Sequence, residues 1–267
     1  MRLLVCLFLL SLVTALASCN RKIKGKDIDL IWADEFSGHE PPNSTKWAYD
    51  IGTSNSGWGN NELQYYTSRP ENVRLLNGKL IIEAHKEAYE GSEYTSARVV
   101  TRGKATWTHK RIAIRAKLPS GRGTWPAIWM LGDNIKDAGW PLCGEIDIME
   151  HVGYVPDSVY GTVHTKAFNH MIGTQDGGST SAKDLETNFH VYSIDWYEDR
   201  IEFKLDGNTY HTFRKRADAT VEEWPFDQPH YLLLNLAVGG NWGGKEGVDT
   251  NIWPQRMEVD WVRVYKL

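Results

Sequence analysis

Short stretches in which apolar residues alternate with polar ones recur along most of the chain. A period of two places successive side chains on opposite faces of a β-strand, so each stretch predicts a strand with one buried face. The strands expected on this basis cover residues 79–84, 94–102, 111–118, 159–165, 191–196, 201–205 and 257–265.

Turn signals separate these stretches, at Asn77-Gly78, at residues 119–123 and at Asp206-Gly207. Helical periodicity is absent, except that residues 183–188 have room for a turn or two of helix. No repeat and no linker divides residues 29–267. The pattern predicts a single all-β domain, a sandwich of two antiparallel sheets. The connections 85–93 and 166–188 are expected to shape a ligand cleft.

One further stretch, GEIDIMEHVG at residues 144–153, has apolar residues between three acids. Alternation places Glu145 and Asp147 on one face, with the isoleucines that follow them pointing into the core. Glu150 is out of phase by one residue. A β-bulge near Met149 would return Glu150 to the face of the other two acids, and bulges are common beside active sites.

Paired carboxylates on one face suit retaining glycoside hydrolysis. That reaction needs two carboxyl groups about 5–5.5 Å apart, one as nucleophile and one as acid and then base. Glu145 and Glu150 would have Cα atoms ~13 Å apart along the bulged strand, a span that two long side chains can bridge. Asp147, between them, would share a proton with a neighbour and separate their pKa values. The alternative is a solvated sheet face with acids there by chance.

The composition adds a hint about the ligand. The chain has 12 Trp and 12 Tyr against 7 Phe, and rings with a polar edge suit sugar-like ligands as well as a large β core. The net charge of −4 disfavours nucleic acid as a partner.

The N-terminus reads as an export signal. Arg2 precedes an apolar run and then small residues, a pattern too short for a membrane span. We expect a lipoprotein signal peptide at residues 1–18, a lipidated Cys19 and a tether over residues 19–28; cleavage near Ala17 without lipid is the alternative. The protein would then be anchored to a membrane of a Gram-negative bacterium, in the outer membrane or on a periplasmic face.

The remaining cysteine forms no pair. The chain has three cysteines; Cys6 leaves with the signal and Cys19 carries lipid, so Cys143 stays a single thiol. A buried, inert thiol is expected there.

Several motifs together resemble the laminarinase-like branch of the family 16 glycoside hydrolases. GEIDIMEHVG is similar to the family's active-site signature in its bulged form. The other similar stretches are WADEF (32–36), GWGNNELQYYT (57–67), YTSARVVTRGK (94–104), RAKLPSGRGTWPAIWMLG (115–132), GTVHTKAFNH (161–170), LLLNLAVGGNWGG (232–244) and VDWVRVY (259–265). The resemblance implies a β-jelly roll with a substrate cleft along the concave sheet.

The resemblance also implies roles for the three acids. Glu145 is the expected nucleophile, Glu150 the general acid and base, and Asp147 the assisting carboxylate that orients Glu145. A hydrophobic cover over Glu150 would keep it protonated until it donates to the leaving oxygen.

The expected sugar contacts follow from the same comparison. Trp125, Trp129 and Trp242 match aromatic platforms, although core packing is the alternative for each. Asn61, Glu62 and Arg98 are expected to bind sugar hydroxyls. His164 is expected beside the catalytic strand, as a ligand or as a structural residue.

Similar proteins have a structural calcium ion on the convex side, away from the chemistry. The matching positions are Glu35, Gly78 and Asp260, which would bind partly through backbone oxygens. A plain strand-end acid is the alternative for Asp260.

The function expected from the sequence is a retaining endo-β-1,3-glucanase, or laminarinase, acting as a monomer on laminarin-type β-glucans without a catalytic cofactor. The alternatives are a mixed-linkage β-glucanase or another polysaccharide hydrolase of the family, such as a carrageenase or agarase. The bulged spacing of the acids disfavours the lichenase branch, whose acids alternate without an extra residue. A non-catalytic carbohydrate-binding lipoprotein is a further alternative, disfavoured because all three acids are present.

Overall fold

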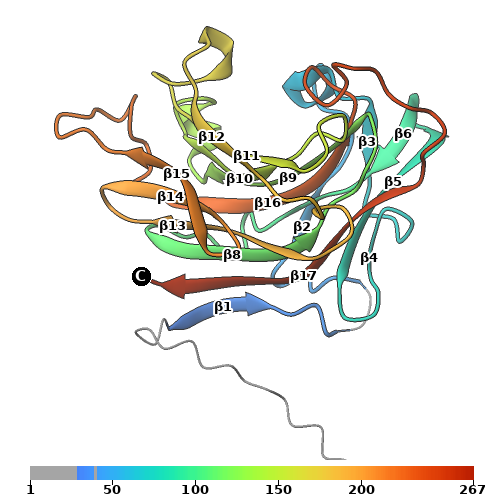
Figure 1. The fold of residues 1–267 in the computed structure, drawn as a ribbon, viewed down its shortest axis with the longest axis horizontal. Coiled ribbons are helices and arrows are strands. Elements are labelled where there is room, and N and C mark those ends of the chain that lie inside the picture. The colour runs from blue at the N-terminus through green and yellow to red at the C-terminus, as the bar shows by residue number, and fades with distance from the viewer. Residues whose placement is uncertain (1–28, 39–40) are drawn as a thin grey trace, which may run out of the picture.

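The computed structural model describes residues 29–38 and 41–267, which form two β-sheets packed face to face (Figure 1). The larger sheet contains ten strands: β1 (Leu30–Asp34), β3 (Gln64–Tyr66), β4 (Val73–Leu75), β5 (Leu80–Tyr89), β6 (Ser92–Ser96), β8 (Lys110–Lys117), β13 (His190–Trp196), β14 (Arg200–Leu205), β15 (Asn208–Arg214) and β17 (Gln255–Lys266). The smaller sheet contains seven: β2 (Ala48–Asp50), β7 (Arg98–Val100), β9 (Thr124–Gly132), β10 (Glu145–Glu150), β11 (Ser158–His164), β12 (Asp176–Ser181) and β16 (His230–Val238). Only short helical turns interrupt the strands: α1 (Ile135–Ala138), η1 (Gly57–Asn61) and η2 (His170–Ile172).

The strand pairing confirms the expected antiparallel sandwich. The smaller sheet has the order β12-β11-β10-β9-β16-β7-β2, and all its pairs are antiparallel. In the larger sheet, β3 beside β6 is a parallel pair. Strand β10 lies inside the smaller sheet and pairs with β11 on one side and β9 on the other.

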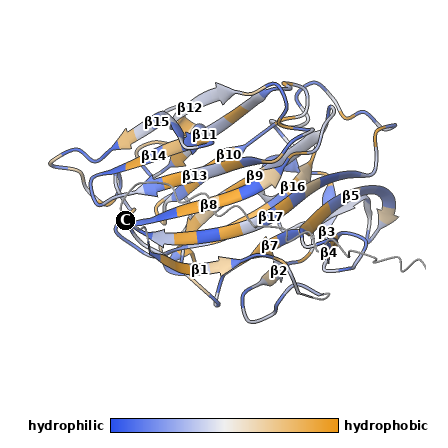
Figure 2. Cartoon of the chain, turned by 60° about the horizontal axis from the view of Figure 1, so that its bottom comes forward, coloured by the Kyte–Doolittle hydropathy of each residue, from blue (hydrophilic) through white to orange (hydrophobic). Residues whose placement is uncertain are grey.

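The main core lies between the sheets and is supplied by the alternating residues. On β8, Ile112, Ile114 and Ala116 point into the main core, while Arg111, Arg115 and Lys117 lie on the opposite face. The alternation appears as bands of orange and blue along β8 and β17 (Figure 2). All the strands expected from alternation are present; the single stretch 94–102 contains two, β6 and β7.

Strands β9 and β16 were not expected from alternation, because nearly all of their residues are buried. Every residue of β16 is buried. Leu232 and Leu234 enter the main core, whereas Tyr231 and Leu233 pack on the opposite face with Val100 and Cys143 in a second, smaller cluster. A strand with two buried faces reads as a continuous apolar run, which has no period of two.

The expected turns are confirmed at two hairpins. Asn77-Gly78 joins β4 to β5 and Asp206-Gly207 joins β14 to β15, in each case with both residues at positive φ. Residues 183–188 form turns rather than a helix, and residues 85–93 belong to the β5–β6 hairpin rather than to a cleft loop.

The expected signal peptide, the tether and Cys19 lie outside the described residues. Within residues 29–38 and 41–267, no helix combines the length and the apolar character needed to cross a membrane.

Candidate active site

The acidic strand β10 contains the expected bulge. Against β9, Asp147 is opposite Trp129 and Glu150 is opposite Ala127, so three steps on β10 match two on β9. Both residues between the two acids, Ile148 and Met149, are buried in the core. The extra residue therefore turns Glu150 to the face of the other acids, as the sequence predicted.

All three acids line a cleft of about 410 Å³ on the outer face of the smaller sheet. The side chains around it are polar, acidic or aromatic: Asn60, Glu62, Trp125, Ala127, Trp129, Glu145, Asp147, Glu150, Tyr160, Thr162, His164, His170, Gln175, Asn235, Asn241 and Trp242. Among the described residues, no lysine or arginine lines this cleft. Its chemistry is that of an acidic site with aromatic walls.

Two tryptophan N–H groups position the two glutamates. Trp140 Nε1 donates to Glu145 Oε2 at 2.8 Å, and Trp125 Nε1 donates to Glu150 Oε1 at 3.0 Å. Each hydrogen bond fixes one oxygen of the carboxylate and leaves the second oxygen free of that tryptophan. The two glutamates are thus held separately, by rings from different segments of the chain.

His164 is the basic side chain nearest to these acids within the cleft lining. Its Nε2 lies 3.3 Å from Asp147 Oδ2 and 3.9 Å from Glu145 Oε1. It lies on β11 directly opposite Glu145. His164 therefore lies beside the catalytic strand, as expected.

Burial raises the pKa of all three carboxyl groups. Loss of solvent is the main cause for Glu145, whose pKa rises to about 8, followed by the charge of Asp147. Burial also raises the pKa of Asp147, which shares a hydrogen bond with Glu145. The pKa of Glu150 rises well above its usual value, for the same two causes. Protons are therefore retained in this cluster near neutral pH, as a general acid requires.

Aromatic rings form one wall of the cleft beside Glu150. Trp242 packs edge-on against Trp125 with ring centroids 5.8 Å apart, and against Tyr160 at 5.0 Å. On the other side, Trp129 donates to Asn235 Oδ1 at 2.7 Å, which fixes its ring in the cleft. All three predicted tryptophan platforms thus line the cleft rather than lying in the core.

Glu62 also lines the cleft, on the side of Trp129 and Asn235. Its carboxylate accepts hydrogen bonds from Gln64 at 2.6 Å and Tyr66 at 3.2 Å, and burial raises its pKa. It is a fixed, partly desolvated group that can accept from a sugar hydroxyl.

Asn61 and Arg98, predicted as sugar ligands, do not line the cleft. Asn61 Nδ2 donates to Asn241 Oδ1 at 2.8 Å, and the neighbouring Asn60 lines the cleft instead. The cause is the irregular turn η1, in which Trp58 and Asn61 have positive φ. Alternation along the chain does not predict side-chain directions in such a turn.

Arg98 lies beside the cleft, on β7 opposite the cleft residue Asn235. It is 8% exposed, its guanidinium lies 4.7 Å from the ring centroids of both Trp58 and Trp129, and its Nε is 3.1 Å from Asp50 Oδ2. Both residues lie next to the cleft lining, and direct contact with a sugar stays a prediction for each.

Sequence reasoning missed several residues outside the strands: Asn60, His170, Gln175 and Asn241 line the cleft, and Trp140 contacts it through its hydrogen bond to Glu145. Trp140 lies just before β10, and its ring packs 5.2 Å from that of His170 on η2; Gln175 follows η2. Residues 166–188 therefore do shape the cleft, as expected. The one signal available in the sequence was a tryptophan five residues before Glu145.

The predicted calcium positions meet at one place on the larger sheet. Strand β17 pairs with β5 up to Val259 opposite Leu80 and then with β1 from Val262 opposite Asp34. Asp260 lies in the gap between these ladders; Gly78 precedes β5 by two residues and Glu35 directly follows β1. The carboxylates of Glu35 and Asp260 pair with Arg263 and Arg115. Calcium at these positions stays a prediction.

Comparisons with known proteins agree with this geometry. The family model of glycosyl hydrolases family 16 matches residues 58–263. A β-glucanase of Rhodothermus marinus is 53% identical over 268 residues, covering 97% of this chain and 93% of its own.

Two solved structures extend the likeness to three dimensions. The laminarinase of Rhodothermus marinus superposes with a TM-score of 0.87 at 55% identity, covering 90% of this chain and 97% of that one. A non-specific endo-β-1,3(4)-glucanase, crystallised with an oligosaccharide at its active site, has a TM-score of 0.87 at 48% identity, over 91% and 96% of the two chains.

Proposed function

The chain belongs to glycosyl hydrolases family 16, and on that premise we propose that it is an endo-acting β-1,3-glucanase that cleaves laminarin-type glucans with retention of configuration. The observation that carries the proposal is the bulge in β10, which places Glu145, Asp147 and Glu150 along one cleft. The solved relatives include laminarinases, so the activity matches both the site and its family.

In the first half-reaction, Glu145 attacks the anomeric carbon and forms the glycosyl-enzyme. Glu150 donates its proton to the glycosidic oxygen, which leaves with the aglycone. In the second half-reaction, Glu150 takes a proton from water and that water displaces Glu145. Trp140 and Trp125 hold the two glutamates in place during these steps.

Asp147 and the aromatic rings assist these steps. Asp147 carries or releases a proton toward Glu145, and His164 lies 3.3 Å from its Oδ2. Rings of Trp125, Trp129 and Trp242 offer flat apolar faces to the C–H faces of glucose units. The glucan is thereby oriented by stacking, with polar groups such as Glu62 binding its hydroxyls.

Neutral glucan is the substrate class that the charges of the cleft favour. Sulfated galactans such as carrageenan have a negative charge on many units, and recognising them calls for arginine or lysine. Over residues 29–38 and 41–267, the cleft has acidic side chains and no basic ones apart from histidine. A carrageenase is accordingly the weaker alternative, while mixed-linkage β-glucan stays open.

The experiment is a comparison of products from laminarin, lichenan and carrageenan. We expect short oligosaccharides from laminarin at early times, with β-configured reducing ends by NMR. Faster cleavage of lichenan would point to the mixed-linkage alternative. Tight binding of laminarin without any turnover would instead favour the carbohydrate-binding alternative.

We also propose that the protein is exported and anchored by lipid at Cys19, which lies outside the described residues. The support is the sequence pattern of residues 1–26. Labelling with a fatty acid should mark the wild type and not Cys19→Ser, and fractionation would then identify the membrane.

A structural calcium ion at Glu35, Gly78 and Asp260 is proposed as a stabiliser away from the chemistry. The support is the gap in the ladder beside β17, where backbone oxygens can face a hard cation. Calcium should raise the Tm of the chelator-treated protein and leave the early kcat unchanged. Sedimentation of the same sample would test the expected monomer.

A further inference from the structure

The cleft contains an arrangement of donor atoms that hydrolysis alone does not require. Glu145, Asp147 and His164 each offer one ligand atom, and these atoms all lie within 4.8 Å of one another. His164 Nε2 is 3.3 Å from Asp147 Oδ2 and 3.9 Å from Glu145 Oε1. One imidazole nitrogen and two carboxylate oxygens therefore lie close enough to share one small ligand.

The spacing fits a tetrahedral metal ion. Bonds of about 2.0–2.1 Å from zinc to nitrogen or oxygen separate the ligand atoms by roughly 3.3 Å. The distance of 3.3 Å between His164 Nε2 and Asp147 Oδ2 already has this value. Glu145 Oε1 is 3.9 Å from the same nitrogen, so it would have to move closer by about half an ångström. The ligand set of one histidine and two carboxylates is one that zinc accepts.

Asp147 supplies an independent sign of an unfilled site. Its side chain is 4% exposed, and its Oδ2, the oxygen that faces His164, is buried without a hydrogen-bond partner. A buried carboxylate oxygen without a donor is costly. Trp140 occupies only Oε2 of Glu145, so Oε1 also remains available toward His164.

The charge around the cluster favours a cation. Four acids line the cleft, Glu62 besides the three on β10, and no lysine or arginine of the described chain lines it. A divalent ion would neutralise two carboxylates that burial otherwise penalises. The open side of the cluster faces the cleft, which leaves room for a water as fourth ligand.

We propose that Glu145, Asp147 and His164 form a binding site for a divalent transition-metal ion of the zinc type, and that the bound ion inhibits the enzyme. The metal takes the lone pair that Glu145 needs for attack, so metal and glucan exclude each other. Competition with glucan rests on the proposed function, whereas binding of the ion does not.

The test is calorimetric titration of the purified, chelator-treated protein with Zn²⁺ alone. We expect one ion per chain at this site and a loss of affinity of about tenfold or more in Asp147→Asn and in His164→Gln. His211→Gln is the matched control, because His211 pairs with Asp176 at 2.8 Å outside the cleft. Its affinity for zinc at the cleft should equal that of the wild type.

Binding of equal strength in the wild type and both cleft variants, or no binding at all, would overturn the proposal. Co²⁺ provides a second measurement on the unaltered protein, should a variant fail to fold. A visible absorption band of bound Co²⁺ that disappears when zinc is added supports the site. The absence of any such band counts against it.

Kinetics on laminarin separates this inference from the proposed function. Zinc should raise the apparent KM and leave kcat unchanged, whereas a fall in kcat at constant KM would overturn the inhibitory mechanism. If the metal-free protein does not cleave laminarin, the proposed function fails, while the calorimetric result still decides the metal site.

Discussion

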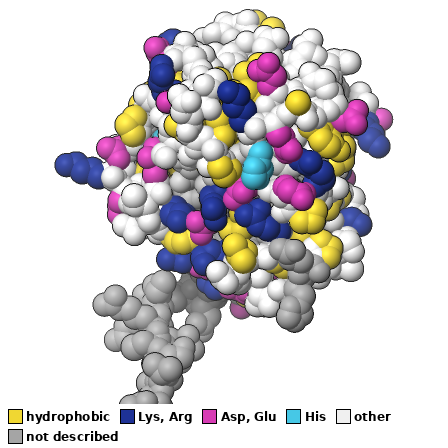
Figure 3. Space-filling model, turned by 90° about the vertical axis from the view of Figure 1, so that its right-hand side faces the viewer, with side chains coloured by type: hydrophobic (Ala, Val, Ile, Leu, Met, Phe, Trp, Pro, Cys, Tyr) yellow, Lys and Arg dark blue, Asp and Glu magenta, His cyan; other side chains and the backbone are white. Residues whose placement is uncertain are grey.

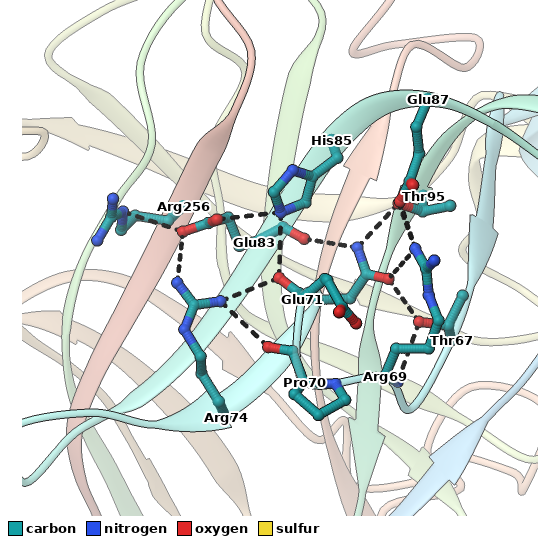
Figure 4. A network of polar contacts seen from close by, with 11 residues as sticks. Thr67, Arg69, Pro70, Glu71, Arg74, Glu83, His85, Glu87, Thr95 and Arg256 are labelled. Atoms are coloured by element: carbon teal, nitrogen blue, oxygen red, sulfur yellow. Dashed lines mark hydrogen bonds and ion pairs between the residues drawn. The ribbon is translucent and has the colours of Figure 1, made fainter.

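Strands β5 and β10 each contain a glutamate with little solvent exposure, and the side chains around the two glutamates differ. Glu83 on β5 has a side chain that is 7% exposed, with Arg74 at 2.9 Å, His85 at 3.0 Å and Arg256 at 3.3 Å (Figure 4). Glu145 on β10 is 15% exposed and has no arginine or lysine among its described ion-pair partners, only His164 at 3.9 Å. The two glutamates are similarly buried, but only Glu83 has arginine side chains that compensate its charge.

The difference teaches how one residue type serves structure in one place and chemistry in another. Around Glu83, acidic and basic side chains alternate, and the network reaches Arg69, Glu87 and Thr95. Figure 3 shows such mixed charges on the face at the β3–β6 end of the molecule. The carboxylate of Glu83 has arginines as partners, whereas burial without such a partner raises the pKa of Glu145.

The largest expected effect is on turnover. Glu145→Gln should lower kcat on laminarin by roughly 10⁴-fold or more, because no nucleophile remains. Glu83→Gln, the same substitution at the compensated site, should leave kcat within about twofold. Reducing-sugar release by both variants measures this, and a Glu145→Gln variant with much of the wild-type rate would refute the assigned role.

The same two variants should change stability in opposite directions. Glu83→Gln leaves two arginines without their carboxylate and should cost about 2 kcal/mol. Glu145→Gln removes a carboxylate whose pKa is raised to about 8, so it should stabilise the protein at pH 8 by about 1–3 kcal/mol. Thermal unfolding at pH 8 measures both.

The pH dependence of that gain follows from its sign. A carboxyl group whose pKa is higher in the folded state destabilises the fold increasingly as pH rises from about 4.3 toward 8. The gain of Glu145→Gln should therefore be absent near pH 4 and largest above pH 8. A gain that is equal at pH 4 and pH 8 would mean that the charge of Glu145 is not its cause.

A smaller effect concerns the acid. The N–H of Trp125 donates to Glu150 and thereby lowers the pKa of that carboxyl group. Trp125→Phe removes this donor, so the pKa of Glu150 should rise. Since the acid must be protonated, the alkaline limb of kcat/KM should move to higher pH by about half a unit. Trp242→Phe keeps that bond and is the control: its alkaline limb should stay in place, although its KM rises.

The smallest effect is expected at Cys143. Its thiol is buried in the smaller cluster, and burial raises its pKa to about 12. Cys143→Ala should leave kcat unchanged, and a thiol reagent should label the wild type only after unfolding. Rapid labelling of the native protein would show that this thiol has a role in function.

The sequence predicted features that depend on local periodicity. Glu150 being out of phase with Asp147 was enough to predict the bulge, and alternation located β8 and β17. Strands β9 and β16 were missed because burial on both faces leaves no period. The roles of the acids came from the resemblance rather than from spacing alone.

Errors were concentrated where the backbone is irregular. Asn61 was displaced from the cleft by positive φ angles in η1, and Asn60 took its place. The packing of Arg98 between Trp58 and Trp129 could not be predicted, because the three residues come from distant segments. Trp140 and His170 reach the cleft through loops whose path depends on tertiary packing.

The bulge at Met149 also determines how this strand can lose or gain a residue during evolution. In an ordinary strand, deleting one residue inverts every side chain beyond it. Here, deletion of Met149 would give Glu-Ile-Asp-Ile-Glu, whose plain alternation keeps all three acids on the same side. Insertion or deletion of one residue at this position therefore keeps the three acids on one face. Natural variants can gain or lose the extra residue, and only the bend of the strand and the packing of the core beneath it would change.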